Sequence, residues 1–395
     1  MPANDPNALL GRRDLFLLRP DVTFLNHGSF GACPRQVFET YQRWQLDLER
    51  EPVDFYGRRL LDELDAARAE LAKAVGSDVQ DLALVTNATM GVNIVAQSLE
   101  LEPGDEVLTT DLEYGAVDNT WDTLCEQRGA RIVRAEVPLW EGSQEAMVEA
   151  VWDRVTPRTR VLSLSHITSG TALILPVEAL IARSRRAGII TLIDGAHAPG
   201  QLTLDMEALG ADYYVGNCHK WLMAPKGSAF LYARREMQDR LRPLLTSHRL
   251  QDDTPSDLRF CRTHECRGTR DMAAFLTIPE ALAFGREQNW DAVRRACHAL
   301  LVETIQRAVD AFGSRPLVPP SREWFAQMAL VPLPPCDAGR LSREMWERHR
   351  VEVPVLGYRG RPYLRLSIQG YNSREDVDRL FEALAVALPR CRVAV

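Results

Sequence analysis

The chain has 395 residues, which is longer than a single small hydrophobic core requires, so two domains are expected. Its charged fraction of 26% is that of an ordinary globular protein, and a formal net charge of -7 leaves no basic surplus to neutralise nucleic-acid phosphates. Eight scattered cysteines and the lack of a long apolar run favour a reduced, cytoplasmic protein without a signal peptide or a membrane span.

Short apolar runs alternate with longer helical patterns through the first two thirds of the chain. This alternation is typical of an α/β domain built on a parallel sheet. Amphipathic helices are predicted at Leu60–Val75 and Val177–Ala187. The predicted strands are Leu82–Thr86, Glu106–Thr110, Arg131–Glu136, Val161–Ser165, Ile189–Ile193, Tyr213–Val215 and Ala229–Tyr232.

The last third mixes helices and strands and predicts a smaller α+β domain. Its helical patterns cover Met272–Gln288 and Arg374–Ala387, and its strand patterns cover Met328–Val331 and Tyr363–Ser367. We therefore expect an N-terminal arm at residues 1–22, a large α/β domain at 23–262 and a small C-terminal domain at 263–395.

Two of the predicted strands end in polar clusters about twenty residues apart. One strand is followed by Asp194 and His197, and the next by His219 and Lys220. Buried parallel strands deliver such clusters to one edge of the sheet. A lysine at that edge, beside a carboxylate and two imidazoles, is well explained as a Schiff-base lysine that holds pyridoxal phosphate, with Asp194 against the pyridine nitrogen.

Each of these residues also has a purely structural interpretation. Asp194 could cap the next helix, and His197 could face the phenolic oxygen of the cofactor or satisfy a turn carbonyl. Lys220 must be neutral to form an imine, and burial beside cationic groups lowers the pKa of an amine in that direction. Lys226 is the rival lysine, but its Ala-Pro-Lys-Gly turn suits a solvent-exposed role better.

Further candidate ligands follow other strands. The segment Thr86–Val92 opens a helix whose free amides favour a phosphate, although a simple helix cap explains it as well. Tyr114 could stack on a flat cofactor ring or belong to the edge of the core. Arg365 could bind a substrate carboxylate or hold two domains together.

Other kinds of site are disfavoured. Cys261, His264 and Cys266 offer metal ligands, but no second cluster pairs with them, so we expect no metal. The sequence has neither a Gly-x-Ser-x-Gly elbow nor a Gly-x-Gly-x-x-Gly fingerprint. A metal-dependent hydrolase and a binding protein that has lost activity are the remaining alternatives.

Taken together, the motifs resemble those of the class V aminotransferase-fold enzymes, and in particular the isopenicillin N epimerase-like branch. The resemblance covers nearly the whole chain and implies a pyridoxal-phosphate transferase fold of type I in a homodimer with a shared active site. The matching motifs are Leu25–Gly31, Glu51–Arg58, Asn87–Asn93, Glu113–Gly115, Ser165–Gly170, Asp194–Pro199, Gly216–Trp221, Arg267–Asp271 and Arg365–Asn372.

The resemblance also implies residue roles. Lys220 would be the Schiff-base lysine and Asp194 the pyridinium partner, Tyr114 would stack on the ring, and His197 would face its phenolic oxygen. The residues implied to hold the cofactor phosphate are Ala88, Thr89, Met90, Asn217, His219 and, from the second subunit, Thr269. The residues implied to bind substrate are Asn26, His27 and, for the α-carboxylate, Arg365.

The expected reaction starts with transimination at Lys220 by an amino-acid-bearing metabolite, and the freed Lys220 then removes the proton from Cα. Reprotonation on the opposite face gives an epimerase, loss of a Cβ substituent gives a C–S lyase, and proton return to the cofactor gives an aminotransferase. We expect epimerase or lyase chemistry, which is what the resemblance implies. A cysteine desulfurase is disfavoured because Val351–Pro362 lacks a nucleophilic cysteine. We expect Glu51–Arg59 and Thr246–Asp257 to set substrate specificity.

Overall fold

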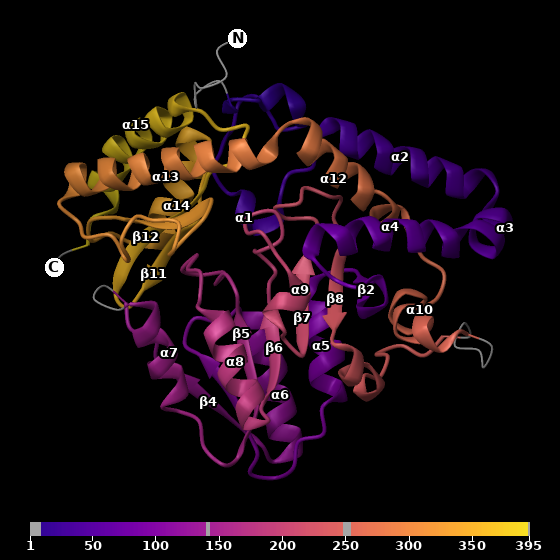
Figure 1. Cartoon of the computed structure of the whole chain (residues 1–395). Coiled ribbons are helices and arrows are strands. Elements are labelled where there is room, and N and C mark those ends of the chain that lie inside the picture. Colours follow the sequence, from indigo (N-terminus) through magenta and orange to yellow (C-terminus); the bar gives the residue numbers. More distant parts are fainter. Residues whose placement is uncertain (1–8, 140–142, 248–253, 394–395) are drawn as a thin grey trace.

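A seven-stranded sheet forms the centre of the computed structural model, which describes residues 9–139, 143–247 and 254–393 (Figure 1). The strand order is β2-β8-β7-β6-β5-β3-β4. Strands β4, β3, β5, β6 and β7 pair in parallel, while β8 is antiparallel to both of its neighbours. The bounds are β2 Leu82–Val85, β3 Glu106–Thr110, β4 Arg131–Ala135, β5 Thr159–Ser165, β6 Ile190–Asp194, β7 Tyr213–Asn217 and β8 Ala229–Ala233.

Helices cover both faces of this sheet, so its inner strands are buried on two sides. Helices α5 (Ala88–Ser98) and α6 (Gly115–Arg128) pack on one face, and α7 (Gln144–Trp152) and α8 (Val177–Ala187) on the other. The short helix α9 spans Met206–Leu209. The predicted strands and the mostly parallel α/β fold are confirmed.

A second group of helices lies across the β2 end of the sheet. It consists of α2 (Arg35–Arg50), α3 (Pro52–Asp54), a π-helical turn (Phe55–Arg59), α4 (Leu60–Val75), α10 (Arg259–Glu265), α11 (Ala273–Leu276) and α12 (Ile278–Glu287). The sequence pattern predicts one helix where α11 and α12 are separate. Pro279, in the first turn of α12, explains the break, because proline has no N–H to continue a helix.

The C-terminal third forms a smaller antiparallel sheet with strand order β11-β12-β9. Its strands are β9 (Met328–Pro332), β11 (Val355–Tyr358) and β12 (Arg361–Ser367), and its helices are α13 (Trp290–Phe312), α14 (Ala338–His349) and α15 (Arg374–Cys391). Helix α15 begins with a capping box in which Ser373 and Asp376 satisfy each other's backbone amides. These elements form a separate layer at the upper left of Figure 1, as the predicted smaller α+β unit requires.

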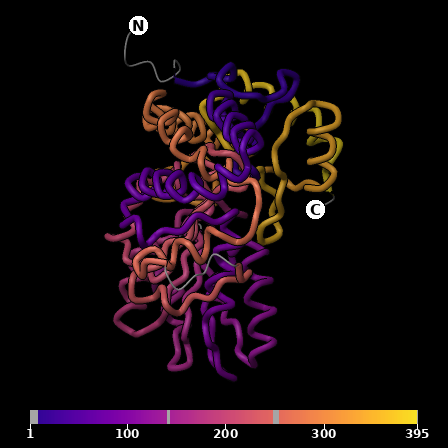
Figure 2. The backbone as a smooth tube through the Cα atoms, turned by 90° about the vertical axis from the view of Figure 1, so that its right-hand side faces the viewer, coloured from indigo at the N-terminus to yellow at the C-terminus, as the bar shows by residue number. Residues whose placement is uncertain are grey.

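The N-terminal segment packs against the C-terminal third. Strand β1 (Thr23–Phe24) pairs in parallel with β10 (Val351–Glu352), and the Gly11 amide donates to the carbonyl of Asn372. Figure 2 shows this indigo segment beside the yellow end of the chain. Helix α1 (His27–Phe30) follows directly and leads into the sheet domain. The domain boundaries at 22/23 and 262/263 stay predictions, and residues 1–8 of the arm lie outside the described residues.

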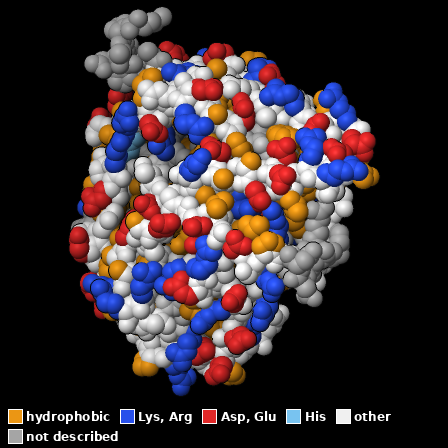
Figure 3. All heavy atoms as spheres, turned by 45° about the vertical axis from the view of Figure 1, so that its right-hand side comes forward, with side chains coloured by type: hydrophobic (Ala, Val, Ile, Leu, Met, Phe, Trp, Pro, Cys, Tyr) orange, Lys and Arg blue, Asp and Glu red, His pale blue; other side chains and the backbone are white. Residues whose placement is uncertain are grey.

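Acidic and basic side chains are interspersed over the face shown in Figure 3. Among the described residues, no helix combines the length and the apolar character needed to cross a bilayer. Short 3-10 turns at Arg13–Leu15, Val79–Asp81, Arg235–Arg240 and Ser256–Leu258 complete the regular structure.

Candidate active site

The polar clusters predicted at two strand ends lie side by side. Strand β6 ends at Asp194, which is in register with Val215 of β7. Gly195 follows, and a Cβ there would come within 2.1 Å of the hydroxyl oxygen of Tyr214, so this turn accepts only glycine. The turn places Nε2 of His197 3.0 Å from Nζ of Lys220. The two clusters therefore form one site at the carboxyl edge of the sheet.

The amine of Lys220 loses its proton more easily than that of an ordinary lysine. Burial lowers the pKa of its amine to about 8, and Arg365 acts in the same direction although Asp194 opposes it. Burial also holds the pKa of His197 well below its usual range. A neutral imidazole thus faces an amine that is readily deprotonated, which is the state a lysine needs to attack an aldehyde.

Trp221 determines which nitrogen of His197 carries the proton. Its indole Nε1 lies 3.3 Å from His197 Nδ1, and an indole N–H can only donate. His197 Nδ1 is therefore the acceptor, and the ring proton resides on Nε2, facing Lys220. The backbone carbonyl of His197 accepts a further bond of 2.8 Å from the Gln201 amide. Trp221 and Gln201 thus fix both the tautomer and the position of this ring.

A second carboxyl group, that of Glu113, influences Asp194. Its Oδ1 accepts the Ala196 amide at 2.9 Å, and burial raises the pKa of Asp194 while Lys220 lowers it. Glu113 is half-buried and accepts from the amide and the hydroxyl of Ser165 at 2.8 and 2.6 Å. Burial raises the pKa of Glu113 to about 7, and the charge of Asp194 adds to the rise. Protonation of Glu113 leaves Asp194 as the ionised member of this pair.

Arg365 lies at the other side of the lysine, on β12. Its Nη1 donates to the carbonyl of Ser169 at 2.8 Å and its Nη2 to the hydroxyl of Ser29 at 2.7 Å. The Nε atom is buried and has no hydrogen-bond partner among the described residues. Burial lowers the pKa of this guanidinium. An unpaired N–H on a buried cation favours an anionic ligand such as a carboxylate.

The first turn of α5 meets the end of β7. The Ala88 amide donates to Oδ1 of Asn217 at 2.8 Å, and the Met90 amide donates to the side chain of Asn87. Because the first turn of a helix leaves amides without intrahelical partners, the Thr89 end of α5 suits an anion. His219 closes this end, with Nδ1 3.1 Å from the Ser228 carbonyl.

The remaining predicted site residues differ in their exposure and in their hydrogen-bond partners. Tyr114 precedes α6, with 47% of its surface exposed. His27 is fully buried, with ring nitrogens 3.1 Å from the Tyr371 hydroxyl and 3.0 Å from the Lys220 carbonyl. Asn26 donates to Glu352 at 3.0 Å, and its Oδ1 accepts from Ser29 at 2.6 Å. Thr269 is outside this cluster of contacts within one subunit.

The comparisons with known proteins agree with this geometry. The family described as aminotransferase class V matches residues 33–380. The chain belongs to the class V aminotransferase family. It is 37% identical over 385 residues to isopenicillin N epimerase of Amycolatopsis lactamdurans, covering 94% of this chain and 96% of that protein. It is 29% identical over 403 residues to L-cysteine desulfhydrase of Arabidopsis thaliana, covering 92% and 87% of the two chains.

The comparison with solved structures agrees with the family assignment. A variant of the C–S lyase C-DES, with glycine covalently linked to its pyridoxal-phosphate cofactor, superposes with a TM-score of 0.83 at 21% identity, covering 95% of this chain and 99% of that one. The predicted family, fold and cofactor are confirmed: this class V enzyme depends on pyridoxal 5'-phosphate. The residues present fit that group, since a near-neutral lysine, a buried carboxylate and a helix N-terminus surround one place.

Several contacts of the site were not predicted from the sequence. Trp221 directly follows the lysine and Glu113 precedes Tyr114, so both lie inside recognisable motifs but have no local signal for their roles. The rival Lys226 is exposed, and its amine donates to the Gly31 carbonyl at 3.0 Å. Among the described residues, no three His, Cys, Asp or Glu side chains are grouped to hold a metal ion.

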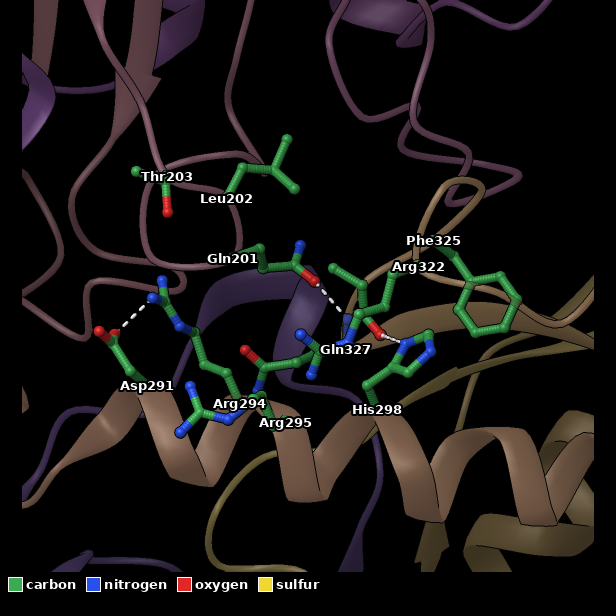
Figure 4. A pocket seen from close by; sticks show the side chains of 11 residues that line it. Gln201, Leu202, Thr203, Asp291, Arg294, Arg295, His298, Arg322, Phe325 and Gln327 are labelled. Carbon is green, nitrogen blue, oxygen red and sulfur yellow. Dashed lines mark hydrogen bonds and ion pairs between the residues drawn. The ribbon is translucent and has the colours of Figure 1, made fainter. Parts of the chain in front are cut away.

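A cavity of about 280 Å³ lies between the segment Gln201–Thr203, helix α13 and the segment that ends at Gln327 (Figure 4). Gln201 points into it, with Oε1 2.8 Å from the Gln327 amide. Arg294 of α13 reaches the same region and donates to the carbonyl of Gly200 at 3.1 Å. These bonds connect the turn that carries His197 to the C-terminal third and keep it from moving independently.

Proposed function

We propose that this protein is an amino-acid epimerase of the isopenicillin N epimerase type, acting at Cα of an amino-acid-bearing metabolite. The observation that carries the proposal is the near-neutral Lys220 amine placed between Asp194 and Arg365. The likeness to isopenicillin N epimerase along 94% of the chain supports this choice of reaction over the other reactions of the family. C–S lyase chemistry is the alternative, supported by the weaker likeness to L-cysteine desulfhydrase.

The charged groups of the site divide the tasks of this reaction among them. Bound pyridoxal phosphate supplies an electron sink conjugated to Cα of the substrate. Arg365 binds the α-carboxylate through its unpaired Nε and through Nη2, which would exchange Ser29 for substrate. Lys220 would hold the cofactor and, once the substrate had freed its amine, would take the proton from Cα on its own face. Asp194 would face the pyridine nitrogen as a carboxylate.

Ala88, Thr89, Met90, Asn217 and His219 would hold the cofactor phosphate at the start of α5. The position of these residues in the first turn of α5 supports the assignment, and the Ala88 and Met90 amides would exchange Asn217 and Asn87 for the phosphate. Burial lowers the pKa of His219 to about 4, and its Nδ1 proton donates to the Ser228 carbonyl, so Nε2 would donate to the phosphate only once that anion had brought a second proton onto the ring. His197 would donate to the phenolic oxygen through the Nε2 proton that Trp221 places there.

Epimerisation needs a proton donor on the face opposite Lys220, and we assign this role to Tyr114. Its hydroxyl lies close enough to Arg365 for a charge on Tyr114 to act on the guanidinium. Its ring precedes α6 with nearly half of its surface exposed, so it can also stack against a flat ligand. A proton leaving Tyr114 would have the Arg365 cation beside it.

We also propose a homodimer in which Thr269 reaches the cofactor phosphate of the second subunit. The neighbouring Arg267 supports this arrangement. Its Nε and Nη2 atoms are buried without a hydrogen-bond partner among the described residues, and burial lowers the pKa of Arg267 to about 10. An acceptor from a second copy would satisfy both atoms. A cytoplasmic location belongs to the same proposal and is supported by the eight cysteines, none of which forms a disulfide.

The deciding experiment incubates the holoenzyme with isopenicillin N and, separately, with L-cysteine in deuterium oxide. Deuterium at Cα in both configurations of the first substrate supports the proposal. Release of sulfide and pyruvate from L-cysteine, with no inversion of isopenicillin N, would assign the protein to the lyases instead. Formation of a keto acid with an aminated cofactor would make it an aminotransferase.

A further inference from the structure

The cavity between Gln201–Thr203 and α13 has no part in the reaction proposed above (Figure 4). Its volume is about 280 Å³, and Lys220, Asp194 and Arg365 are not among its lining residues. Its walls come from two parts of the fold, because Gln201–Thr203 follows β6, whereas α13 and the segment before β9 belong to the C-terminal third. Ligand sites occur preferentially at such junctions.

The charges on the walls of this cavity do not balance. Arg294, Arg295 and Arg322 line the cavity, and Asp291 is the only carboxylate among the described residues that line it. Asp291 already forms an ion pair with Arg294. Neither Arg295 nor Arg322 has an ion-pair partner in the part of the chain that the structure describes. Three arginines against one aspartate leave the walls with two positive charges in excess.

The fold brings Arg295 and Arg322 to one place from separate elements. Arg295 lies in the second turn of α13, and His298 follows three residues later on the same side of the helix. The charge of Arg322 reaches that imidazole, because burial lowers the pKa of His298 and Arg322 lowers it further, while the bond to the Ala326 carbonyl opposes the shift. Like charges held close together repel, and a bound anion would relieve that repulsion.

Hydrogen bonds fix the polar side chains between these arginines. Gln201 is held at both ends, since its Nε2 donates to the His197 carbonyl and its Oε1 accepts from the Gln327 amide, each at 2.8 Å. Nδ1 of His298 lies 2.8 Å from the Ala326 carbonyl and donates to it. Walls that are already held in place lose little freedom when a ligand binds, so the cavity is preorganised.

We propose that this cavity is a second ligand site, which binds a small organic dianion of the phosphate-monoester type. Because Arg295 and Arg322 converge beside one imidazole, a single doubly charged group suits them better than two separate carboxylates. Guanidinium groups bind phosphate oxygens through pairs of hydrogen bonds. The organic part of the ligand would lie against Leu202 and Phe325, which are apolar members of the wall. The inference does not depend on which reaction the enzyme catalyses.

The test titrates sn-glycerol 3-phosphate into the holoenzyme by isothermal calorimetry, at constant ionic strength and about pH 8, where the phosphate carries two charges. We expect one site per subunit, weaker binding of inorganic phosphate and no binding of glycerol. Arg295→Gln and Arg322→Gln each remove one cation and should weaken the binding of sn-glycerol 3-phosphate by about tenfold. Arg186→Gln removes an exposed arginine of α8 and is the matched control, with a change of less than about twofold.

Equal losses in the control and in the cavity variants would mean general attraction to a cationic surface and would overturn the inference. The absence of binding to the unaltered holoenzyme would do the same. Arg365→Lys should bind sn-glycerol 3-phosphate as the unaltered protein does, whereas a loss of binding in that variant would move the ligand to the catalytic centre and refute a second site. The cofactor absorbance of Arg295→Gln and Arg322→Gln should stay unchanged, which separates a lost contact from a lost fold.

Discussion

Nε2 of His197 lies 3.0 Å from Nζ of Lys220, while Trp221 donates to the other ring nitrogen. The imidazole therefore presents an N–H to the lysine instead of a lone pair. In such a contact the amine of Lys220 must accept the hydrogen bond. A protonated lysine cannot accept it, because an ammonium group has no lone pair. Burial favours the same state, because it lowers the pKa of both groups. The geometry favours the free amine, and a pKa of about 8 brings that form within reach near neutral pH, where an ordinary lysine is almost wholly protonated.

The first prediction concerns which lysine binds the cofactor. Borohydride reduction of the holoenzyme, followed by peptide mass spectrometry, should place the adduct on Lys220. Lys220→Ala should lower turnover by at least about a thousandfold, since both the covalent anchor and the Cα base are lost. Lys226→Ala is the matched control and should keep the adduct on Lys220. An adduct on Lys226 in the unaltered protein would refute the assignment.

The second prediction concerns the pH dependence of cofactor capture by protein from which the cofactor has been removed. Only the unprotonated amine attacks the aldehyde, and the pKa of Lys220 is lowered to about 8. The rate should therefore rise about tenfold per pH unit below that value and level off above it. Stopped-flow absorbance at fixed cofactor concentration measures this directly. A half-maximal rate near the usual lysine value of 10.5 would contradict the structure.

A site residue can be predicted from the sequence when the pattern that marks it lies within a few neighbouring positions. The apolar runs of β3, β6 and β7 are local, and so are the polar residues that follow them, which is why Asp194 and Lys220 could be placed at one sheet edge from the sequence. The same residues already indicated the cofactor, and the family motifs supported it. Pro279 also offered a local signal for the break between α11 and α12, but the apolar periodicity masked it.

The contacts that tune the site are not local. The bond between Trp221 and His197 spans 24 positions, and the bonds between Glu113 and Ser165 span 52. Such contacts depend on how side chains are directed across neighbouring strands, which no periodicity reveals. Specificity was expected from Glu51–Arg59 and Thr246–Asp257, but residues 248–253 lie outside the described part of the chain. The expectation for Glu51–Arg59, which forms α3 and the π-helical turn, stays a prediction.

The third prediction tests whether different residues move the proton on the two faces of the substrate Cα. Tyr114→Phe keeps the aromatic ring and removes the hydroxyl that we assign to the second face. Lys220 can still exchange the Cα proton, so deuterium should enter the substrate with retention of configuration while inversion falls by about a hundredfold or more. Nuclear magnetic resonance follows exchange, and chiral chromatography follows inversion. If neither rate falls, Tyr114 acts by stacking alone, and if both fall together its hydroxyl serves a step that the two faces share; either result refutes the assignment.

The fourth prediction tests the carboxylate clamp. Arg365→Lys keeps the charge but loses the planar fork and the unpaired Nε. We expect kcat/KM to fall by about a hundredfold, mostly through KM, because the lost contact holds the substrate rather than the reacting bond. Ser29→Ala removes one partner of Arg365 and should cost less than about tenfold. A fall in kcat alone would show that Arg365 acts on the chemistry and not on binding.

The last prediction concerns stability. Burial raises the pKa of Glu113 from 4.5 to about 7 in the folded protein, so the folded state binds a proton more tightly than the unfolded one. The stability that this carboxyl contributes is fully present below pH 4.5 and is lost as the pH rises through about 7. Glu113→Gln cannot titrate and should remove this loss.

Relative to that variant, the unaltered protein should therefore lose on the order of 2–3 kcal/mol between about pH 5 and pH 8. Urea unfolding of both proteins without cofactor, at the two pH values, measures the difference and keeps ligand binding out of it. Glu100→Gln replaces an exposed glutamate and serves as the control, with no pH-dependent change expected. Parallel curves for the unaltered protein and Glu113→Gln would mean that Glu113 is ionised throughout. Asp194 would then face a neighbouring negative charge, and its own ionisation against the cofactor ring would need a different explanation.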